Sequence, residues 1–307
     1  MPKNNGSVVK DRISVIIRAF NEAQHIGNLL DNIFEQELGN RLLEVIVVDS
    51  GSTDGTIEIV KGYPVKLVHI KPKEFSFGRS LNTGIKSSQG SILVFVSAHC
   101  YPDNKKWLIN LVTPFDGDRM VGLVYGKQRG DWRTKFSENQ IFLKLFPDES
   151  NSNQFHPFCN NANCAIRRSL WEETPYDEDL TGLEDLDWAK KIVQMGYHLS
   201  YRADAEIIHV HEENWSKVFR RYEREAIALK RIFPEMRFTF FDFLKLFFIN
   251  AFIDYARGLG GGIRLKDIGW IFVFRLMQFW GTYRGTNYGS GVTDRLKRQF
   301  YYPKFGK

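Results

Sequence analysis

The chain has 307 residues, of which 43% are hydrophobic and 25% are charged, so it can bury a large core and is not expected to be disordered. Its formal net charge is +6, which favours an anionic partner such as a nucleotide diphosphate, an anionic membrane surface or nucleic acid. Charge alone does not choose among these partners.

The N-terminal residues 1–10 are polar and lack the apolar segment of a signal peptide, which predicts a cytoplasmic protein. Three cysteines fit that compartment. Cys159 and Cys164 lie near one another in the chain, but no second pair completes a zinc site, so we expect reduced and packed thiols.

The first strong pattern is a strand, a polar turn and a helix. Residues 13–17 form a β-branched run that predicts a buried strand, and Leu29, Leu30 and Ile33 follow with helical spacing. A second apolar run, 45–48, ends in a turn of carboxylates and hydroxyls, so the two strands complete a βαβ unit. Ligands bind at the carboxyl ends of such strands, which makes the following residues candidates for nucleotide binding: Ala19, Phe20, Asn21, Glu22, Asp49, Ser50, Ser52 and Asp54.

An alternative for this turn is purely structural, with Asp54 or Thr53 capping the helix from Thr56. No Gly-x-Gly-x-x-Gly or Walker-type loop occurs at either turn, which argues against a dinucleotide enzyme or a P-loop ATPase. Residues 65–70 predict a third strand, and 75–84 lead into a short helix. A fourth strand, 92–96, ends in Ser97, Ala98 and His99, where the alternative for His99 is a capping or packing role.

In order and spacing, these segments resemble the GT-A-fold glycosyltransferases of family 2, from about residue 13 to about residue 225. Segments 75–82 and 125–128 resemble rhamnosyltransferase-like members. The resemblance implies an α/β fold with a mostly parallel sheet flanked by helices, and an inverting enzyme that uses a nucleotide-diphosphate sugar. It also implies donor contacts from Arg79, Asn82, Ser97 and Ala98.

The resemblance departs from the family at the metal motif. Family members usually carry Asp-x-Asp after the fourth strand, where carboxylates hold Mg²⁺ or Mn²⁺, whereas this chain has Ser97 and His99 at those positions. A serine hydroxyl is a poor ligand for a hard cation, so we expect weaker metal affinity, or phosphate charge met by Arg or Lys. His209 and His211 alternate on one face of a strand-like segment and are the other metal candidates, with His211 preferred. The alternative is an exposed strand histidine with no ligand.

The catalytic candidates lie in segment 182–188, which opens a helix that continues to about Met195. Acids there suit the helix dipole, and that alone could explain them. The resemblance implies that Asp185 is the general base, with Glu184 and Asp187 as second choices. On the acceptor side we expect a mobile loop over 131–156, with acceptor contacts from Asn161, Asn163 and Trp188. The alternative for the asparagines is a turn without a ligand.

A helix beginning near Ser216 places cations on one face, and this face meets either a diphosphate, a lipid headgroup or solvent: Lys217, Arg220, Arg221 and Arg224. Segments 238–256 and 268–280 are apolar, but polar residues interrupt them, which favours helices that lie at an interface over spanning helices. With the basic, aromatic tail 295–307 they predict peripheral attachment to the inner face of the membrane. The alternative is a helical subdomain or a dimer contact, so a homo-oligomer is left open.

We therefore expect a polar tail at 1–10, a GT-A domain at 11–230 and a helical extension at 231–307. The predicted function is transfer of a sugar to a hydroxyl of a glycan or lipid-linked acceptor in surface polysaccharide biosynthesis. The rivals are a metal-independent transferase and a catalytically silent nucleotide- or glycan-binding scaffold at the membrane. Nucleic-acid binding is not expected, because the basic residues are dispersed.

Overall fold

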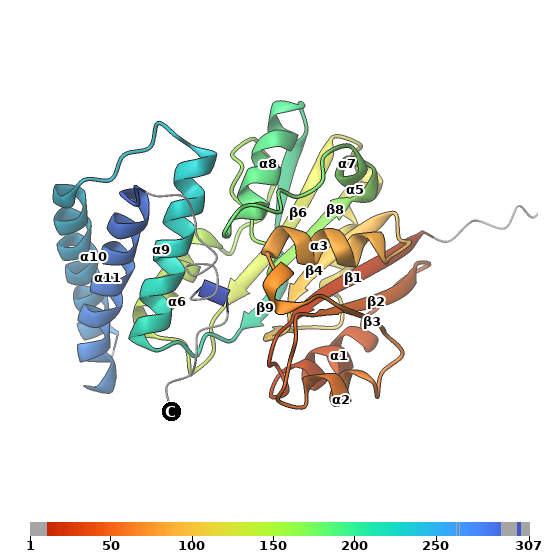
Figure 1. The fold of residues 1–307 in the computed structure, drawn as a ribbon, viewed down its shortest axis with the longest axis horizontal. Coiled ribbons are helices and arrows are strands. Elements are labelled where there is room, and N and C mark those ends of the chain that lie inside the picture. Colours follow the sequence, from red (N-terminus) through yellow and green to blue (C-terminus); the bar gives the residue numbers. More distant parts are fainter. Residues whose placement is uncertain (1–10, 262, 264, 290–299, 302–307) are drawn as a thin grey trace, which may run out of the picture.

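The computed structural model describes residues 11–261, 263, 265–289 and 300–301. A central sheet carries helices on both faces, and α9, α10 and α11 stand side by side next to it (Figure 1). The elements are, in chain order, β1 (Arg12–Ala19), α1 (Ile26–Phe34), β2 (Leu42–Asp49), α2 (Thr56–Val60), β3 (Lys66–His69), the 3₁₀ helix η1 (Pro72–Glu74), α3 (Phe77–Lys86), β4 (Ile92–Ser97), β5 (Cys100–Pro102), α4 (Trp107–Val112), α5 (Pro114–Gly117), β6 (Val121–Arg129), α6 (Phe136–Leu145), β7 (Asn151–Gln154), β8 (Asn163–Arg167), α7 (Arg168–Glu173), α8 (Glu184–Gln194), β9 (His198–His209), α9 (Trp215–Ile232), α10 (Phe240–Gly260) and α11 (Leu265–Thr286).

The sheet has a core on each side, as expected for strands that read as continuous apolar runs. Side chains alternate along a strand, so Val15 and Ile17 of β1 pack with α1, while Ile16 packs on the other face with Leu81 and Ile85 of α3. The sequence prediction of a doubly covered sheet is confirmed. The three cysteines are buried and unpaired, as predicted.

The strand order is β3-β2-β1-β4-β8-β6-β9-β5, and β7 pairs with β9. Strands β3, β2, β1, β4, β6 and β9 run in one direction, whereas β8, β5 and β7 run against them. The mostly parallel sheet is therefore confirmed, with β8 as an antiparallel insertion. Because β1, β2, β4 and β9 share a direction, the residues at their carboxyl ends gather at one edge of the sheet.

Two expectations about the second half of the chain need correction. Residues 131–156 are not a loop, because α6 and β7 form within them. Helix α6 has no clear signal in the sequence, because its apolar residues do not form one stripe along the helix. It is instead stabilised by packing against α10 and α11, which lie far away in sequence. Helix α10 also extends beyond the expected apolar segment 238–256 and continues through Gly260.

The C-terminal helices are joined to the sheet domain through α9, which continues past the expected boundary at residue 230. Two glycines of α11 allow this close packing. A Cβ atom at Gly281 would lie 2.6 Å from the carbonyl oxygen of Phe219, and one at Gly285 would lie 2.2 Å from that of Glu223. Any side chain at these positions would push α11 away from α9.

No helix among the residues described has the length and apolarity needed to cross a membrane. Residues 1–10 and most of the basic tail 295–307 lie outside the described residues, so the expectations for them stay predictions.

Candidate active site

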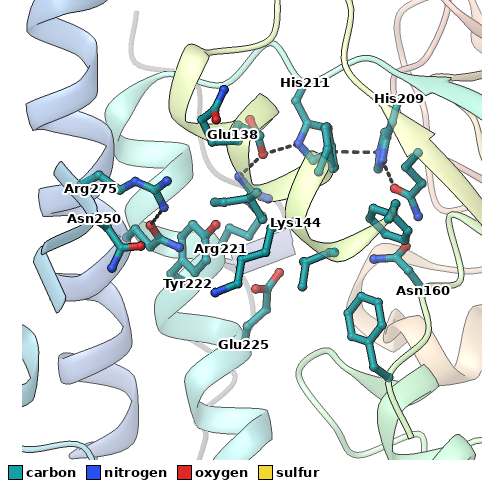
Figure 2. Close-up of a pocket in the computed structure, with 18 of the residues that line it drawn as sticks. Glu138, Lys144, Asn160, His209, His211, Arg221, Tyr222, Glu225, Asn250 and Arg275 are labelled. Atoms are coloured by element: carbon teal, nitrogen blue, oxygen red, sulfur yellow. Dashed lines mark hydrogen bonds and ion pairs between the residues drawn. The ribbon is translucent and has the colours of Figure 1, made fainter. Parts of the chain in front are cut away.

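Two cavities adjoin at the carboxyl edge of the sheet. The first, which we call the turn cavity, has a volume of about 620 Å³ and is lined by the turn after β1, the end of β4 and α9. The second, the helix cavity, has a volume of about 750 Å³ and lies between α6, the start of α8 and the C-terminal helices (Figure 2). His211 and Arg221 line both cavities, so the two spaces meet at these residues.

The turn after β1 is held in a constrained shape by the loop after β2. Asn21 has a left-handed backbone with φ 55°, its N–H donates to Ser52 Oγ at 2.9 Å, and its Oδ1 accepts from the N–H of Thr53 at 2.8 Å. Asp54 accepts from the N–H of Ala23 at 3.0 Å and from the N–H of Thr56 at 3.1 Å. Helix α2 has Gly55 at its N-cap and no side-chain cap, so the capping alternative is not borne out. Asp54 instead accepts from the N–H of Thr56 just before the helix, and it lines the turn cavity.

The candidates for nucleotide binding divide into two groups. Phe20, Asn21, Glu22, Asp54 and Ser97 line the turn cavity. Asp49 is buried, its carboxylate accepts from the N–H of Gly51 at 2.9 Å, and it lies 3.5 Å from His69 Nδ1. Asp49 therefore stabilises the loop after β2. It lines neither cavity, and the same holds for Ala19, Ser50, Ser52 and Ala98.

Arg79 and Asn82 of α3 have packing roles. Arg79 Nε donates to Glu178 Oε2 at 2.7 Å, and Asn82 Nδ2 donates to the carbonyl of Tyr176 at 2.9 Å while its Oδ1 accepts from Trp171 Nε1. These bonds tie α3 to the segment before α8. Neither residue lines the turn cavity or the helix cavity, so donor contact from Arg79 and Asn82 stays a prediction.

The acceptor predictions for Asn163 and Trp188 are wrong, because both side chains are fully buried. Asn163 Oδ1 accepts from Trp107 Nε1 at 2.8 Å, and Trp188 Nε1 donates to the carbonyl of Thr174 at 2.6 Å. Asn161 is also buried, and its backbone N–H donates to Asp185 Oδ2 at 2.9 Å. Asn161 therefore positions Asp185, while its neighbour Asn160 lines the helix cavity.

Three histidines converge where the cavities meet. His99, His209 and His211 each offer a ligand atom within 4.8 Å of the others, and the Nε2 atoms of His209 and His211 lie 2.9 Å apart. The Nδ1 atom of each ring is held by another side chain: Glu22 at 2.9 Å for His99, Gln128 at 2.8 Å for His209 and Glu138 at 2.6 Å for His211. Figure 2 shows the bond between Glu138 and His211. Metal-binding histidines in proteins have this second hydrogen bond, which fixes the ring.

This cluster passes a test of fit for a divalent cation. Adjacent nitrogen ligands at about 2.0–2.1 Å from an ion lie roughly 3 Å apart, which matches the spacing of His209 and His211. The imidazole nitrogens can hold the ion without a carboxylate at position 97, so the Ser97 substitution does not remove the site. Nitrogen ligands suit Zn²⁺ or Co²⁺ better than Mg²⁺.

The protonation of the cluster differs from ring to ring. Burial, together with His211 and His99, holds the pKa of His209 well below its usual range, so His209 is neutral. Burial also opposes charge on His99, but Glu22 outweighs it and raises the pKa of His99. Burial disfavours the Glu138 carboxylate as well, yet Arg221 and His211 dominate and lower the pKa of Glu138 to about 2.

The start of α8 presents a buried carboxyl group to the helix cavity. Asp185 lines that cavity, and burial and the neighbouring charge of Glu184 raise its pKa to about 7. Glu184 forms an ion pair with Arg18 at 3.0 Å and lines neither cavity. Leu183, just before them, has φ 57°, a strained conformation for a branched side chain. Backbone strain of this kind is concentrated at functional sites.

The basic face predicted on α9 is confirmed, because all four of its cations line the turn cavity: Lys217, Arg220, Arg221 and Arg224. Several lining residues of the helix cavity were missed. Glu138 was hidden in the segment expected to be a loop, and the others carry no local signal in the sequence: Gln128, Asn160, Tyr222, Glu225, Asn250 and Arg275.

Known proteins resemble the chain in sequence. The model of the family described as "Glycosyl transferase family 2" matches residues 14–174, more than half of the chain. The chain is 30% identical over 200 residues to glycosyltransferase AglE of Haloferax volcanii, a match that covers 62% of this chain and 64% of that protein, slightly less than two thirds of it. It is 27% identical over 220 residues to the O-antigen chain rhamnosyltransferase WbaN of Salmonella anatum, covering 68% and 69% of the two chains.

Solved structures share the fold. A mannosyltransferase from Pyrobaculum calidifontis, in complex with GDP-Man and Mn²⁺, superposes with a TM-score of 0.60 at 22% identity and covers 97% of this chain and 89% of its own. Glucosyl-3-phosphoglycerate synthase from Mycobacterium tuberculosis, with Mn²⁺, UDP and glucosyl-3-phosphoglycerate, gives 0.55 at 20% identity, with coverage of 72% and 80%. The expected fold class is confirmed by these structures.

Proposed function

The chain belongs to glycosyltransferase family 2, and on this basis we propose that it is an inverting transferase acting on a nucleotide-diphosphate sugar. The acceptor is a hydroxyl of a glycan or of a lipid-linked saccharide in cell-surface polysaccharide biosynthesis, in keeping with the rhamnosyltransferase among its relatives. The donor occupies the turn cavity, and the acceptor occupies the helix cavity.

The observation that carries this proposal is the position of Asp185. It is a buried carboxyl group with a pKa raised to about 7, on the wall of one cavity that adjoins a second cavity, into which α9 brings four cations. A general base that works near neutral pH needs a pKa of this kind. A scaffold that only binds nucleotide or glycan has no need of a carboxyl group with a raised pKa, which weighs against the silent alternative.

The reaction follows from this arrangement. Asp185 takes the proton of the acceptor hydroxyl as its oxygen attacks the anomeric carbon. The bond from that carbon to the diphosphate oxygen breaks on the opposite face, so the configuration inverts. The nucleoside diphosphate leaves with an added negative charge, which the cations of α9 stabilise: Lys217, Arg220, Arg221 and Arg224.

His99, His209 and His211 would hold a divalent cation at the junction of the cavities. When bound there, the ion supplies Lewis-acid stabilisation of the leaving diphosphate. The protein's own contribution is orientation, since Glu22, Gln128 and Glu138 fix the three rings.

The exposed face of α10 supports peripheral attachment to the inner face of a membrane. Four apolar side chains along one line of the helix are largely exposed: Phe241 (81%), Phe248 (62%), Phe252 (74%) and Leu259 (75%). An exposed apolar face of this kind marks an interaction site. Co-sedimentation with vesicles containing phosphatidylglycerol tests this, and Phe252→Ser should weaken the binding. If the wild type and Phe252→Ser bind the vesicles equally and the protein is a dimer in solution, the exposed face is instead the contact of a homo-oligomer.

Two measurements test the proposed function. Calorimetric titration with UDP, dTDP and GDP, each with Mn²⁺ and with EDTA, should show binding of one nucleotide, and loss of binding in EDTA would locate the cation at the donor. Asp185→Asn should keep that binding and lose transfer. Tight binding that ignores EDTA would favour a metal-independent enzyme, and no binding of any nucleotide would contradict the proposal.

A further inference from the structure

The helix cavity has two walls that come from different parts of the chain. One wall carries Asp185 and Asn160, from the start of α8 and the loop before β8. The other wall comes from the C-terminal helices, with Asn250 on α10 and Arg275 on α11 (Figure 2). The space in front of Asp185 is therefore completed by residues more than 60 positions further along the chain.

The wall made by the C-terminal helices is rigid. Arg275 Nε lies 2.7 Å from Asp254 Oδ2 and its Nη2 lies 3.0 Å from Oδ1, so a bidentate ion pair joins α10 to α11 in the interior. Arg275 Nη1 also donates to Gln278 Oε1 at 2.8 Å. Arg257 Nη1 reaches across to Gln140 Oε1 of α6 at 3.1 Å. A wall fixed in this way presents its remaining polar groups in set positions, which favours ligand binding.

Charged groups of both signs line the helix cavity. Four cations (Lys144, Arg221, Arg257 and Arg275) face four carboxyl groups (Glu138, Asp185, Glu225 and Asp254). The turn cavity has the same count, because four carboxyl groups line it together with the four cations of α9: Glu22, Asp54, Glu212 and Glu213. In the helix cavity, however, two of the cations already form ion pairs, Arg221 with Glu138 and Arg275 with Asp254. In the part of the chain that the structure describes, the Glu225 carboxylate has no cation within hydrogen-bond length, and it disfavours an anionic ligand, so this cavity suits an uncharged polar ligand.

Two residues of this wall keep hydrogen-bonding capacity. Asn250 Nδ2 donates to the carbonyl of Leu246 at 2.8 Å, and no bond to its Oδ1 is found among the described residues. The nearest cation to the Glu225 carboxylate is Arg224 at 3.9 Å, beyond hydrogen-bond length. Apolar and aromatic side chains lie among these polar groups: Leu246, Ile253, Phe158 and Phe279. Amides and carboxylates beside flat apolar surfaces match a sugar ring, which has hydroxyls at its rim and apolar faces.

We propose that α9, α10 and α11 form half of the acceptor site, where Asn250 and Glu225 bind the hydroxyls of an uncharged sugar residue of the acceptor. The inference rests on the proposed function, because it takes the helix cavity as the acceptor side. It adds the chemical class of the acceptor residue and gives the C-terminal helices a role in recognition.

The test measures saccharide binding directly on the full chain. Saturation-transfer NMR is recorded with the methyl glycosides of rhamnose, mannose and galactose, and with methyl glucuronoside as the anionic comparison. The wild type should bind at least one neutral glycoside better than the glucuronoside. Asn250→Ala and Glu225→Gln should each weaken that binding by about three- to tenfold, the loss of one hydrogen bond.

Asn32→Ala is the matched control. Asn32 is also a half-buried helical asparagine whose Nδ2 bonds the carbonyl four residues earlier, at 2.7 Å, but it lies on α1 and lines neither cavity. It should bind the glycosides like the wild type. Thermal melting of all variants checks that they are folded.

Three results would overturn the inference: preferential binding of the glucuronoside, no binding of any neutral glycoside, or unchanged binding in both variants. Nucleotide titration of the same proteins separates this failure from that of the proposed function. If the wild type and both variants bind a nucleotide equally but the glycoside results fail, only the acceptor inference falls. If no nucleotide binds, the proposed function fails on its own.

Discussion

Replacing Asp185 by Asn should have opposite effects on activity and on stability at alkaline pH. In the folded chain, burial and the charge of Glu184 raise the pKa of Asp185 from 3.8 to about 7. A carboxyl group whose pKa is higher in the folded state binds its proton more tightly there. Stability is therefore lost as the pH rises from about 4 to about 7, and this loss is complete above 7.

The size of the effect follows from the two pKa values. A difference of about three pH units corresponds to about 4 kcal/mol of unfolding free energy. An Asn side chain has no such titration and avoids this loss. However, Asp185 accepts hydrogen bonds from the backbone N–H groups of Asn161 and Leu186, and Asn has one carbonyl oxygen, so one of these groups loses its acceptor. That costs about 1–3 kcal/mol at every pH. The variant should be less stable than the wild type at pH 4.5 and more stable at pH 8.

Urea unfolding followed by tryptophan fluorescence at both pH values measures the two free energies. Asp187→Asn is the control in the same helical turn. Asp187 lies 2.6 Å from Lys191, so removing its charge breaks an ion pair and should not stabilise the protein at pH 8. A stability difference for Asp185→Asn that stays constant with pH would refute the burial argument, and retained transfer activity would refute the assignment of the base.

Three further predictions concern the surroundings of Asp185, the cluster and the seam between helices. The charge of Arg18 lowers the pKa of Asp185, so Arg18→Met should raise this pKa and shift the increase of kcat/KM with pH to higher pH. An unchanged pH profile would show that Arg18 does not influence the base. In competition with a chromophoric chelator, the protein should bind Zn²⁺ at least about tenfold more tightly than Mg²⁺. His209→Ala should reduce this difference in affinity. Equal affinities of the wild type for the two ions would contradict a site made of nitrogen ligands. Gly285→Ala should lower stability by about 1–3 kcal/mol in thermal melts, whereas Gly269→Ala, with open space around it, should be neutral or stabilising.

The first half of the fold could be predicted from sequence because its signals are local. The β-branched runs of β1, β2 and β4 identify buried strands without reference to the rest of the chain. The cationic face of α9 could be predicted for the same reason, since helical spacing fixes which residues share a face.

The sequence could not tell a polar residue at the site from one buried beside it. Asn163 and Trp188 lie near the expected site in sequence, but they pack against Trp107 and Thr174, and no local pattern predicts those contacts. The cavity wall that carries Asn250 and Glu225 was missed for a related reason. Asn250 and Glu225 come together only because α11 packs closely on α9, which depends on two glycines.

The seam between α9 and α11 also determines where the chain can be divided. A cut near residue 230, at the expected domain boundary, would end the polypeptide within α9. The carbonyl groups of Phe219 and Glu223, which α11 covers, would then be exposed to solvent. The cavity in front of Asp185 would be open to water on the side that α10 and α11 close. The shortened protein would keep the turn after β1 but lose the wall of the helix cavity that α10 and α11 provide. If this wall binds the acceptor as we propose, exchanging the C-terminal helices between relatives should change the acceptor specificity.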